Sequence, residues 1–158
     1  MIEREEGICR SLADRFGFLE GKYSIPRERR IFVEVSRENM LEVIEYAAGL
    51  GFNSLCTITG LDLGEELQSV YHIADKNGMV INVKVNVPKS DPVIKTVINI
   101  YNGSVFYERE LEGMLGFKVE GLAQGRHYPL PDNWPEGQYP LRKDWKAEMM
   151  HKAKGGTE

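Results

Sequence analysis

Two glutamates, an arginine and a further glutamate stand close together in the stretch YERELEGMLG at 107–116 of this 158-residue chain. Glu108 and Glu112 are four positions apart, so a helix would place them on one face, while Glu110 would point elsewhere. Such carboxylates could act as acid and base if their environments differed. The same pattern is typical of an ion-pair anchor built on Arg109, or of a solvated helix face. Spacing alone leaves all three interpretations open.

Other residue types that carry chemistry lack the spacing that it needs. Cys9 and Cys56 form no C-x-x-C pair, so we do not expect this chain alone to hold an iron–sulfur cluster or structural zinc. Buried free thiols are the favoured interpretation, with a disulfide between them left open. His72, His127 and His151 show no metal-binding spacing, and we expect His72 to be a half-buried structural residue. The sequence also contains neither a glycine-rich nucleotide loop nor a serine-nucleophile motif.

Composition narrows the class of protein. The formal net charge is -4, so the strongly basic footprint of a nucleic-acid-binding protein is absent, although local basic stretches such as RERR at 27–30 remain. A hydrophobic fraction of 42% suits one compact domain. No apolar run approaches the roughly 20 residues that span a bilayer. The charged N-terminus is also unlike a signal peptide, so we expect the chain to face the cytosol.

Hydrophobic periodicity predicts the elements that position the charged cluster. A helical pattern runs from 2 to about 17, and the strands KYSI and RIFVEV follow it. Ser36 is then expected to cap a second helix, which Gly51 ends. Three further strands are predicted: NSLCTITGL, LQSVYHIAD and MVINVKVNV. The Asn77-Gly78 pair between the last two is a typical hairpin turn. Residues alternate along the final strand, so the face that includes Asn82 is expected to be wet.

The pattern changes twice after the last strand. Residues 91–101 and 104–115 read as two short helices with Asp91 and Ser104 as N-caps. From 118 onward periodicity stops, yet prolines and glycines are mixed with aromatic residues such as Trp134. We therefore expect an extended arm that buries its aromatic rings on another protein. The last residues, 154–158, are expected to fray.

The order of elements predicts the fold class and the domain limits. We expect an α+β protein: a two-layer domain with a mostly antiparallel mixed sheet and helices on one face, in the order α-β-β-α-β-β-β. Short helices and an extended C-terminal arm follow. On this interpretation residues 1–117 form the α+β domain, and residues 118–158 form the partner-binding arm and the frayed end.

Three segments together resemble a known family. FYERELEGMLG, RHYPLPDNW and YPLRKDW look like the signature of the 30-kDa subunit family of respiratory complex I. Homologues of this family occur in membrane-bound, energy-converting nickel–iron hydrogenases. The resemblance is specific from 106 to 145. It rests on these residues: Glu108, Arg109, Glu110, Met114, Gly116, Gly121, Arg126, Leu130, Pro131, Trp134, Pro140, Leu141, Arg142, Lys143 and Asp144.

The chain also departs from the family pattern. Gly113 stands where an acidic residue usually precedes the methionine, and Leu115 where an aromatic residue is usual. The Gly-His-Pro step of quinone-reducing members reads Gly-Leu-Ala at 121–123. These departures favour the hydrogenase-related branch, or its ferredoxin- and sulfur-linked relatives.

The resemblance implies a non-catalytic structural and assembly subunit. In the family, this subunit binds no cofactor, sits in the peripheral arm of an ion-translocating complex, and clasps the large subunit that carries the quinone or nickel–iron site. An adjacent small subunit holds an iron–sulfur cluster. The implied location is the cytoplasmic face of the membrane, with membrane contact only through the complex and no nucleic acid as a partner.

The resemblance also suggests which residues meet other subunits. We expect interface roles for Glu108, Arg109, Glu110, Arg126, Trp134, Pro140, Leu141, Arg142, Lys143, Asp144 and Trp145. Arg109 is expected to pair with a carboxylate, and Glu108 or Glu110 with a basic group such as Arg142 or Lys143. The alternatives are a free-standing enzyme that uses Glu108 and Glu112 as acid and base, and a small adaptor that binds another protein through the arm.

Overall fold

The computed structural model describes residues 2–150 and confirms an α+β fold. Helix α1 (Glu3–Arg15) and a 3-10 turn (Gly17–Leu19) precede the hairpin of β1 (Tyr23–Arg27) and β2 (Arg30–Val35), and helix α2 (Met40–Gly49) follows. Strands β3 (Ser54–Asp62), β4 (Glu66–Ala74) and β5 (Val80–Pro88) complete the predicted order. The chain continues through β6 (Val93–Lys95), α3 (Ser104–Leu115) and β7 (Lys118–Glu120).

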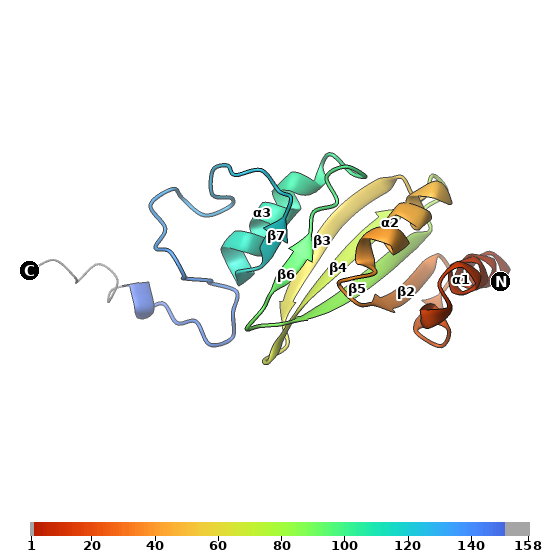
Figure 1. The fold of residues 1–158 in the computed structure, drawn as a ribbon, viewed down its shortest axis with the longest axis horizontal. Coiled ribbons are helices and arrows are strands. Elements are labelled where there is room, and N and C mark those ends of the chain that lie inside the picture. Colours follow the sequence, from red (N-terminus) through yellow and green to blue (C-terminus); the bar gives the residue numbers. More distant parts are fainter. Residues whose placement is uncertain (1, 151–158) are drawn as a thin grey trace, which may run out of the picture.

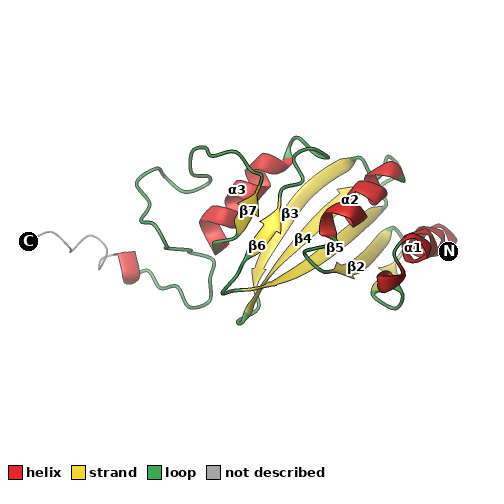
Figure 2. Ribbon diagram, in the orientation of Figure 1, coloured by secondary structure: helices red, strands yellow, loops and turns green. Residues whose placement is uncertain are grey.

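The five long strands form one mixed sheet in the order β1-β2-β5-β4-β3. Strands β2 and β5 are parallel, and the other neighbours are antiparallel. Helices α2 and α3 lie over the same face of this sheet, and α1 lies beside β2 at its far edge (Figures 1 and 2). The two-layer arrangement with helices on one face is therefore as predicted.

The core lies between the sheet and the helices. The alternate positions Ile81, Val83, Val85 and Val87 of β5 are completely buried, as the period-two pattern predicts. The opposite face is not uniformly wet, because Asn82 is only 3% exposed. Its amide donates to the carbonyl of Ile31 (2.8 Å) and its carbonyl contacts Nδ1 of the half-buried His72 (2.6 Å).

Close packing of α3 on the sheet depends on Gly60 in β3. A Cβ atom at this position would lie 2.3 Å from Cδ1 of Leu115 and 2.6 Å from Cδ2 of Leu111. Both leucines are 2% exposed, so they have little room to move away. The missing side chain of Gly60 thus lets α3 approach β3 directly.

The helix predicted for 91–101 is wrong. The structure forms strand β6 there, and β6 pairs in parallel with β7. This segment is rich in β-branched residues, which favour strands. Its backbone also finds distant partners, since Thr96 N–H donates to the Glu120 carbonyl (2.9 Å) and Lys118 N–H donates to the Pro92 carbonyl (2.9 Å). Asp91 is therefore not a helix cap.

Three local predictions also need correction. Helix α2 begins at Met40 with Asn39 at its N-cap, because a turn occupies the residues after Ser36. Helix α3 begins at Ser104 itself, with Gly103 as the N-cap. The segment from 118 onward opens with the regular strand β7 instead of an irregular chain. Local cap and turn signals specify an end only to within a few residues.

Two other predictions hold in the structure. Gly78 adopts a left-handed conformation (φ 78°) at the hairpin between β4 and β5, and Gly51 does so (φ 100°) after α2. The predictions for His151 and for fraying at 154–158 concern residues outside the range that the structure describes.

Candidate functional site

Helix α3 places the first glutamate of the charged cluster inside the protein. Glu108 is 0% exposed. Its Oε2 atom accepts the hydroxyl of Thr96 (2.6 Å), and its Oε1 atom accepts the backbone N–H of Val97 (2.7 Å). Glu108 is therefore an internal tether that holds the segment after β6 against α3. Because these neutral donors satisfy its carboxylate, Glu108 does not pair with a basic residue of this chain, and its predicted role at a subunit interface stays a prediction.

Burial of Glu108 also affects the sheet beneath it. The hydroxyl of Tyr71, on β4, is fully buried. Burial, and then the carboxylate of Glu108, raise the pKa of Tyr71 above its ordinary value. The carboxylate is thus enclosed among core residues, away from solvent.

Arg109 contacts the arm instead of a carboxylate. Its guanidinium donates to the Ala123 carbonyl (2.8 Å) and lies against Gly125, where a Cβ atom would be 2.3 Å from the nearest guanidinium nitrogen. Within residues 2–150 Arg109 forms no ion pair, so the prediction that it pairs with a carboxylate is wrong for this chain taken alone. Glu110 is half-exposed on the same helix. Because residue 125 is a glycine, the guanidinium of Arg109 can pack against the start of the arm and hold it.

The geometry does not support an acid/base pair. Glu112 accepts the N–H of Val119 (3.3 Å). Partial burial raises the pKa of Glu112 against the opposing effects of that hydrogen bond and of Arg109. Glu108, four residues earlier, is sealed from solvent and uses both oxygens in hydrogen bonds. Two carboxylates of which one cannot meet a substrate do not form a general acid/base site.

The PLRKD segment, 140–144, caps the C-terminus of α3. The last carbonyls of a helix lack intrahelical partners. Here Leu141 N–H donates to the Met114 carbonyl (3.0 Å), and Nε of Arg142 donates to the Leu115 carbonyl (2.6 Å). The guanidinium of Arg142 also lies 4.4 Å from the ring centroid of Tyr139. A cation at this end of a helix is further favoured by the helix dipole.

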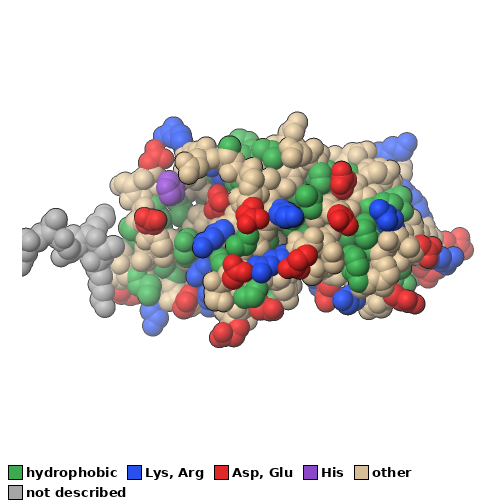
Figure 3. Space-filling model, viewed as in Figure 1, with side chains coloured by type: hydrophobic (Ala, Val, Ile, Leu, Met, Phe, Trp, Pro, Cys, Tyr) green, Lys and Arg blue, Asp and Glu red, His purple; other side chains and the backbone are tan. Residues whose placement is uncertain are grey.

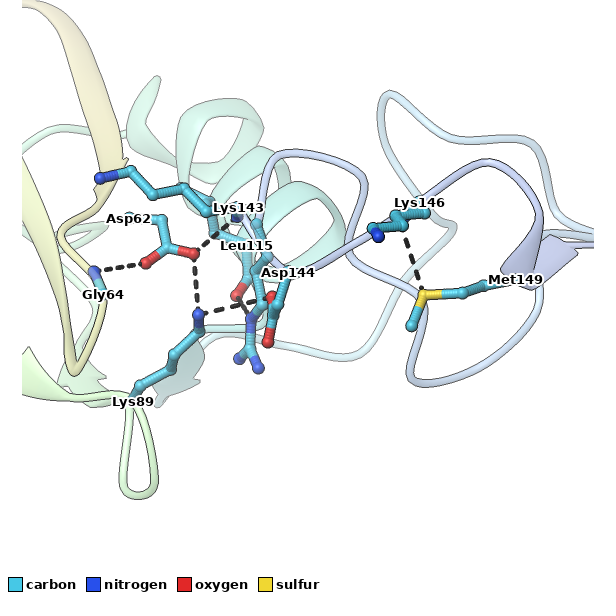
Figure 4. Close-up of polar contacts among 9 residues, drawn as sticks. Asp62, Gly64, Lys89, Leu115, Lys143, Asp144, Lys146 and Met149 are labelled. Carbon is cyan, nitrogen blue, oxygen red and sulfur yellow. Dashed lines mark hydrogen bonds and ion pairs between the residues drawn. The ribbon is translucent and has the colours of Figure 1, made fainter.

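The same segment is joined to the sheet through Asp62, at the end of β3 (Figure 4). Oδ2 of Asp62 accepts Nζ of Lys89 (2.8 Å) and the backbone N–H of Lys143 (2.8 Å), and Oδ1 accepts Gly64 N–H (2.8 Å). Lys89 also reaches Asp144, at 3.5 Å. We call this set of contacts the Asp62 anchor.

Electrostatics strengthen the Asp62 anchor. The side chain of Asp62 is only 1% exposed, and that of Lys89 is 18% exposed. Burial by itself would raise the pKa of Asp62, but the hydrogen bonds from Lys89, Lys143 and Gly64 outweigh it and lower that pKa to about 2. The sequence did not reveal this site. Its one local signal was the Asp-x-Gly turn at 62–64, which says nothing of a partner in the arm.

Between these attachments the arm folds on itself. The rings of Trp134 and Trp145 lie 6.1 Å apart, and their indole N–H groups donate to the carbonyl (2.7 Å) and the side-chain oxygen (2.9 Å) of Gln138. Both tryptophans are half-buried. That another chain covers them stays a prediction. Arg126, by contrast, projects from the arm with 87% of its side chain exposed and pairs with Asp132 (2.7 Å).

The remaining chemical groups are dispersed. Cys9 and Cys56 are both free thiols, so the alternative of a disulfide between them is wrong. Cys9 is buried as expected, but Cys56 is exposed. Burial, and then Glu5 and Glu6, raise the pKa of Cys9 to about 11. Over residues 2–150, no three His, Cys, Asp or Glu side chains gather as a metal site would require. Acidic and basic side chains alternate on the face drawn in Figure 3.

Comparison with known proteins identifies the family. Residues 33–150 match the sequence model of a family described as "Respiratory-chain NADH dehydrogenase, 30 Kd subunit". This chain belongs to that family. The matched region includes the whole of α3, residues 118–150 and so the PLRKD segment, and the resemblance read from 106–145 is confirmed.

Two relatives match this chain over most of its length. The chain is 33% identical to an F(420)H(2) dehydrogenase subunit of Methanosarcina mazei, over 89% of this chain and 90% of that protein. It is 35% identical to membrane-bound hydrogenase subunit beta of Pyrococcus furiosus, over 96% and 94%. The dehydrogenase subunit and the hydrogenase subunit thus match this chain with similar identity and coverage. The preference for the hydrogenase-related branch therefore stays a prediction.

A solved structure supports the fold. The chain superimposes with a TM-score of 0.83 on a chain from the membrane-bound sulfane sulfur reductase, an archaeal respiratory membrane complex, with 98% of this chain and 92% of that chain covered. At 24% identity this likeness concerns the fold alone. Among the described residues, no helix has the length and apolar character needed to cross a bilayer.

Proposed function

We propose that this chain is a non-catalytic structural and assembly subunit in the peripheral arm of a membrane-bound, ion-translocating electron-transfer complex. It clasps the large subunit of that complex, which resembles a nickel–iron hydrogenase large subunit, and lies beside the small subunit with the iron–sulfur cluster. The proposal extends to location: the cytoplasmic face of the membrane, with no contact to the bilayer except through partners.

The observation that carries the proposal is the way the arm is held. PLRKD joins the arm to the end of α3 and to Asp62, and Arg109 secures its start. Between these points many side chains remain exposed, including Tyr128 (45%). A segment that is fixed at both ends but leaves aromatic surface uncovered is suited to binding another protein, because little ordering entropy is then lost on association.

The relatives support the same role. Their names describe subunits of a dehydrogenase and of a membrane-bound hydrogenase. Glu108, which an independent enzyme would need as its acid, instead serves as an internal tether. We further propose that the chain itself carries no cofactor, and that iron–sulfur clusters and any nickel–iron site belong to its partners.

Affinity purification from solubilised membranes, with the tag on this chain, tests the proposal. We expect the large subunit and an iron–sulfur subunit to co-purify in fixed stoichiometry. Iron should then be present in the complex and absent from the separately expressed chain after dialysis. Recovery of a chain that is monodisperse without partners, or of a stoichiometric metal in the isolated chain, would overturn it.

A further inference from the structure

A hollow of about 580 Å³ lies between α3 and the part of the arm that passes over it, beside the contact of Arg109 with the start of the arm. Phe106 and Arg109 of α3 line one side, and residues 126–128 and 130–132 of the arm line the other. None of the internal contacts of Glu108 or of PLRKD uses this space. It is therefore a surface that the folding of this chain leaves available.

Two exposed aromatic rings form the apolar part of the hollow. Phe106 is 59% exposed and Tyr128 is 45% exposed, and their rings meet edge to face with centroids 5.7 Å apart. Leu130 and Pro131 continue the same lining. Large apolar side chains gathered at one exposed place are typical of interaction sites rather than of ordinary surface.

Cations stand beside these rings. Arg126 and Arg109 both line the hollow, and Asp132 is its one acidic residue, so the lining carries a net charge of +1 in a chain of net charge -4. Arg109 uses one amino group for Ala123 and retains further N–H donors. The pair of Arg126 with Asp132 is exposed on both sides, so it contributes little and is easily exchanged.

We propose that this hollow receives an acidic, partly apolar segment of the partner subunit. A carboxylate of that segment pairs with Arg126 in place of Asp132, and a neighbouring apolar side chain packs on Phe106 and Tyr128. Arginine and aromatic residues are the types enriched at the energetic centres of interfaces. A guanidinium can bind a carboxylate with two parallel hydrogen bonds, which also orients the segment. The inference rests on the proposed function, and it names the place and the chemistry of the contact.

Zero-length cross-linking of the intact complex tests the pairing. The double variant Arg126→Lys with Asp132→Asn places an amine in the hollow and removes the competing carboxylate of its own chain. Carbodiimide treatment of the purified complex, followed by mass spectrometry of peptides, should then join position 126 to an Asp or Glu of a partner subunit. Arg37→Lys is the matched control, because Arg37 pairs with Glu38 (3.2 Å) and Asp91 (2.7 Å) of its own chain and should join only to these two residues.

Charge variants supply a second measurement. Arg126→Glu should lower the fraction of chain recovered in the complex at least tenfold, whereas Asp132→Asn should leave that fraction unchanged or raise it. If both variants lowered the recovered fraction equally, the Arg126–Asp132 ion pair would act only within this chain, and the proposal would be overturned. Unchanged urea midpoints for both isolated variants would show that assembly, and not folding, was affected.

The outcomes separate this inference from the proposed function. If the wild-type chain co-purifies with its complex but position 126 joins no partner carboxylate, only the docking proposal fails. If the wild-type chain is recovered without partners, the proposed function fails. Binding of the isolated chain to phosphatidylglycerol vesicles that is lost in Arg126→Glu would assign the hollow to an anionic lipid and overturn the protein-partner proposal.

Discussion

Oδ2 of Asp62 accepts the backbone N–H of Lys143 at 2.8 Å, across 81 positions of sequence. The same oxygen binds Nζ of Lys89, so one carboxylate joins the end of β3, the residue that follows β5 and the PLRKD segment. Because the side chain is 1% exposed, these contacts have little competition from water. Asp62 therefore joins the arm to the sheet through a buried carboxylate.

Replacement of Asp62 by alanine should destabilise the protein by about 3 kcal/mol, the low end for removing one partner of a buried ion pair. The N–H of Lys143 would lose its acceptor, and Lys89 would keep only Asp144, at 3.5 Å. Urea unfolding measures the change, and hydrogen exchange at Leu141 and Lys143 shows whether the arm has detached. Asp91→Ala, which breaks an exposed ion pair with Arg37, is the control and should cost less than about 1 kcal/mol. Similar losses for both variants would contradict a special role for Asp62.

The Asp62 anchor should weaken in acid. Its folded pKa of about 2 lies below the ordinary value of 3.8. A depressed carboxylate pKa contributes stability that is fully present above the unfolded pKa and is lost as the pH falls through the folded pKa. The stability difference between wild type and Asp62→Asn should therefore be constant above about pH 5 and shrink as the pH falls toward 2. Urea midpoints at a series of pH values measure it, and a difference that grew in acid would refute the assignment.

Glu108→Gln should weaken folding and assembly without changing the chemistry of the complex. Glutamine fills the same volume but offers one acceptor where Thr96 and Val97 require two, so a loss of about 1–3 kcal/mol is expected. Assembled fraction and turnover per assembled complex should be measured on the same membranes. Glu110→Gln, on the half-exposed side of α3, is the control and should change stability by less than about 0.5 kcal/mol. Normal assembly with turnover reduced by about 10²–10⁴-fold would instead indicate a catalytic acid.

Two glycine substitutions should act in opposite directions. Gly60→Ala forces a methyl group against Leu111 and Leu115 and should cost about 1–3 kcal/mol, as overpacking does. Gly7→Ala lies in α1 with nothing within 4 Å of the added atom, so it should stabilise by about 0.5–1 kcal/mol. Urea unfolding of both variants measures this contrast. A neutral Gly60→Ala would mean that α3 can move away from β3 at little cost.

Much of the fold follows from local sequence. Alternation along β5 predicts the buried side chains Ile81, Val83, Val85 and Val87, because a strand turns successive residues to opposite faces. The Asn77-Gly78 turn adopts its left-handed conformation for reasons contained in two residues. The signature in 106–145 also identifies the family, since it consists of residue types at defined spacings. These features require no knowledge of distant contacts.

The candidate site depends on contacts that sequence does not display. Segment 91–101 becomes a strand because β7 supplies a partner for its backbone, and helical spacing could not reveal that pairing. Glu108 is an internal tether because Val97, 11 positions earlier, meets its carboxylate.

The sequence by itself determined the family, the order of the main elements and the faces that they bury. Only the tertiary structure decided which charges are internal and which remain exposed. The physical reason is that periodicity reflects the neighbours of a residue within its own element. The state of a carboxylate, by contrast, depends on donors and burial supplied from across the chain, as Lys89 and Lys143 supply them to Asp62.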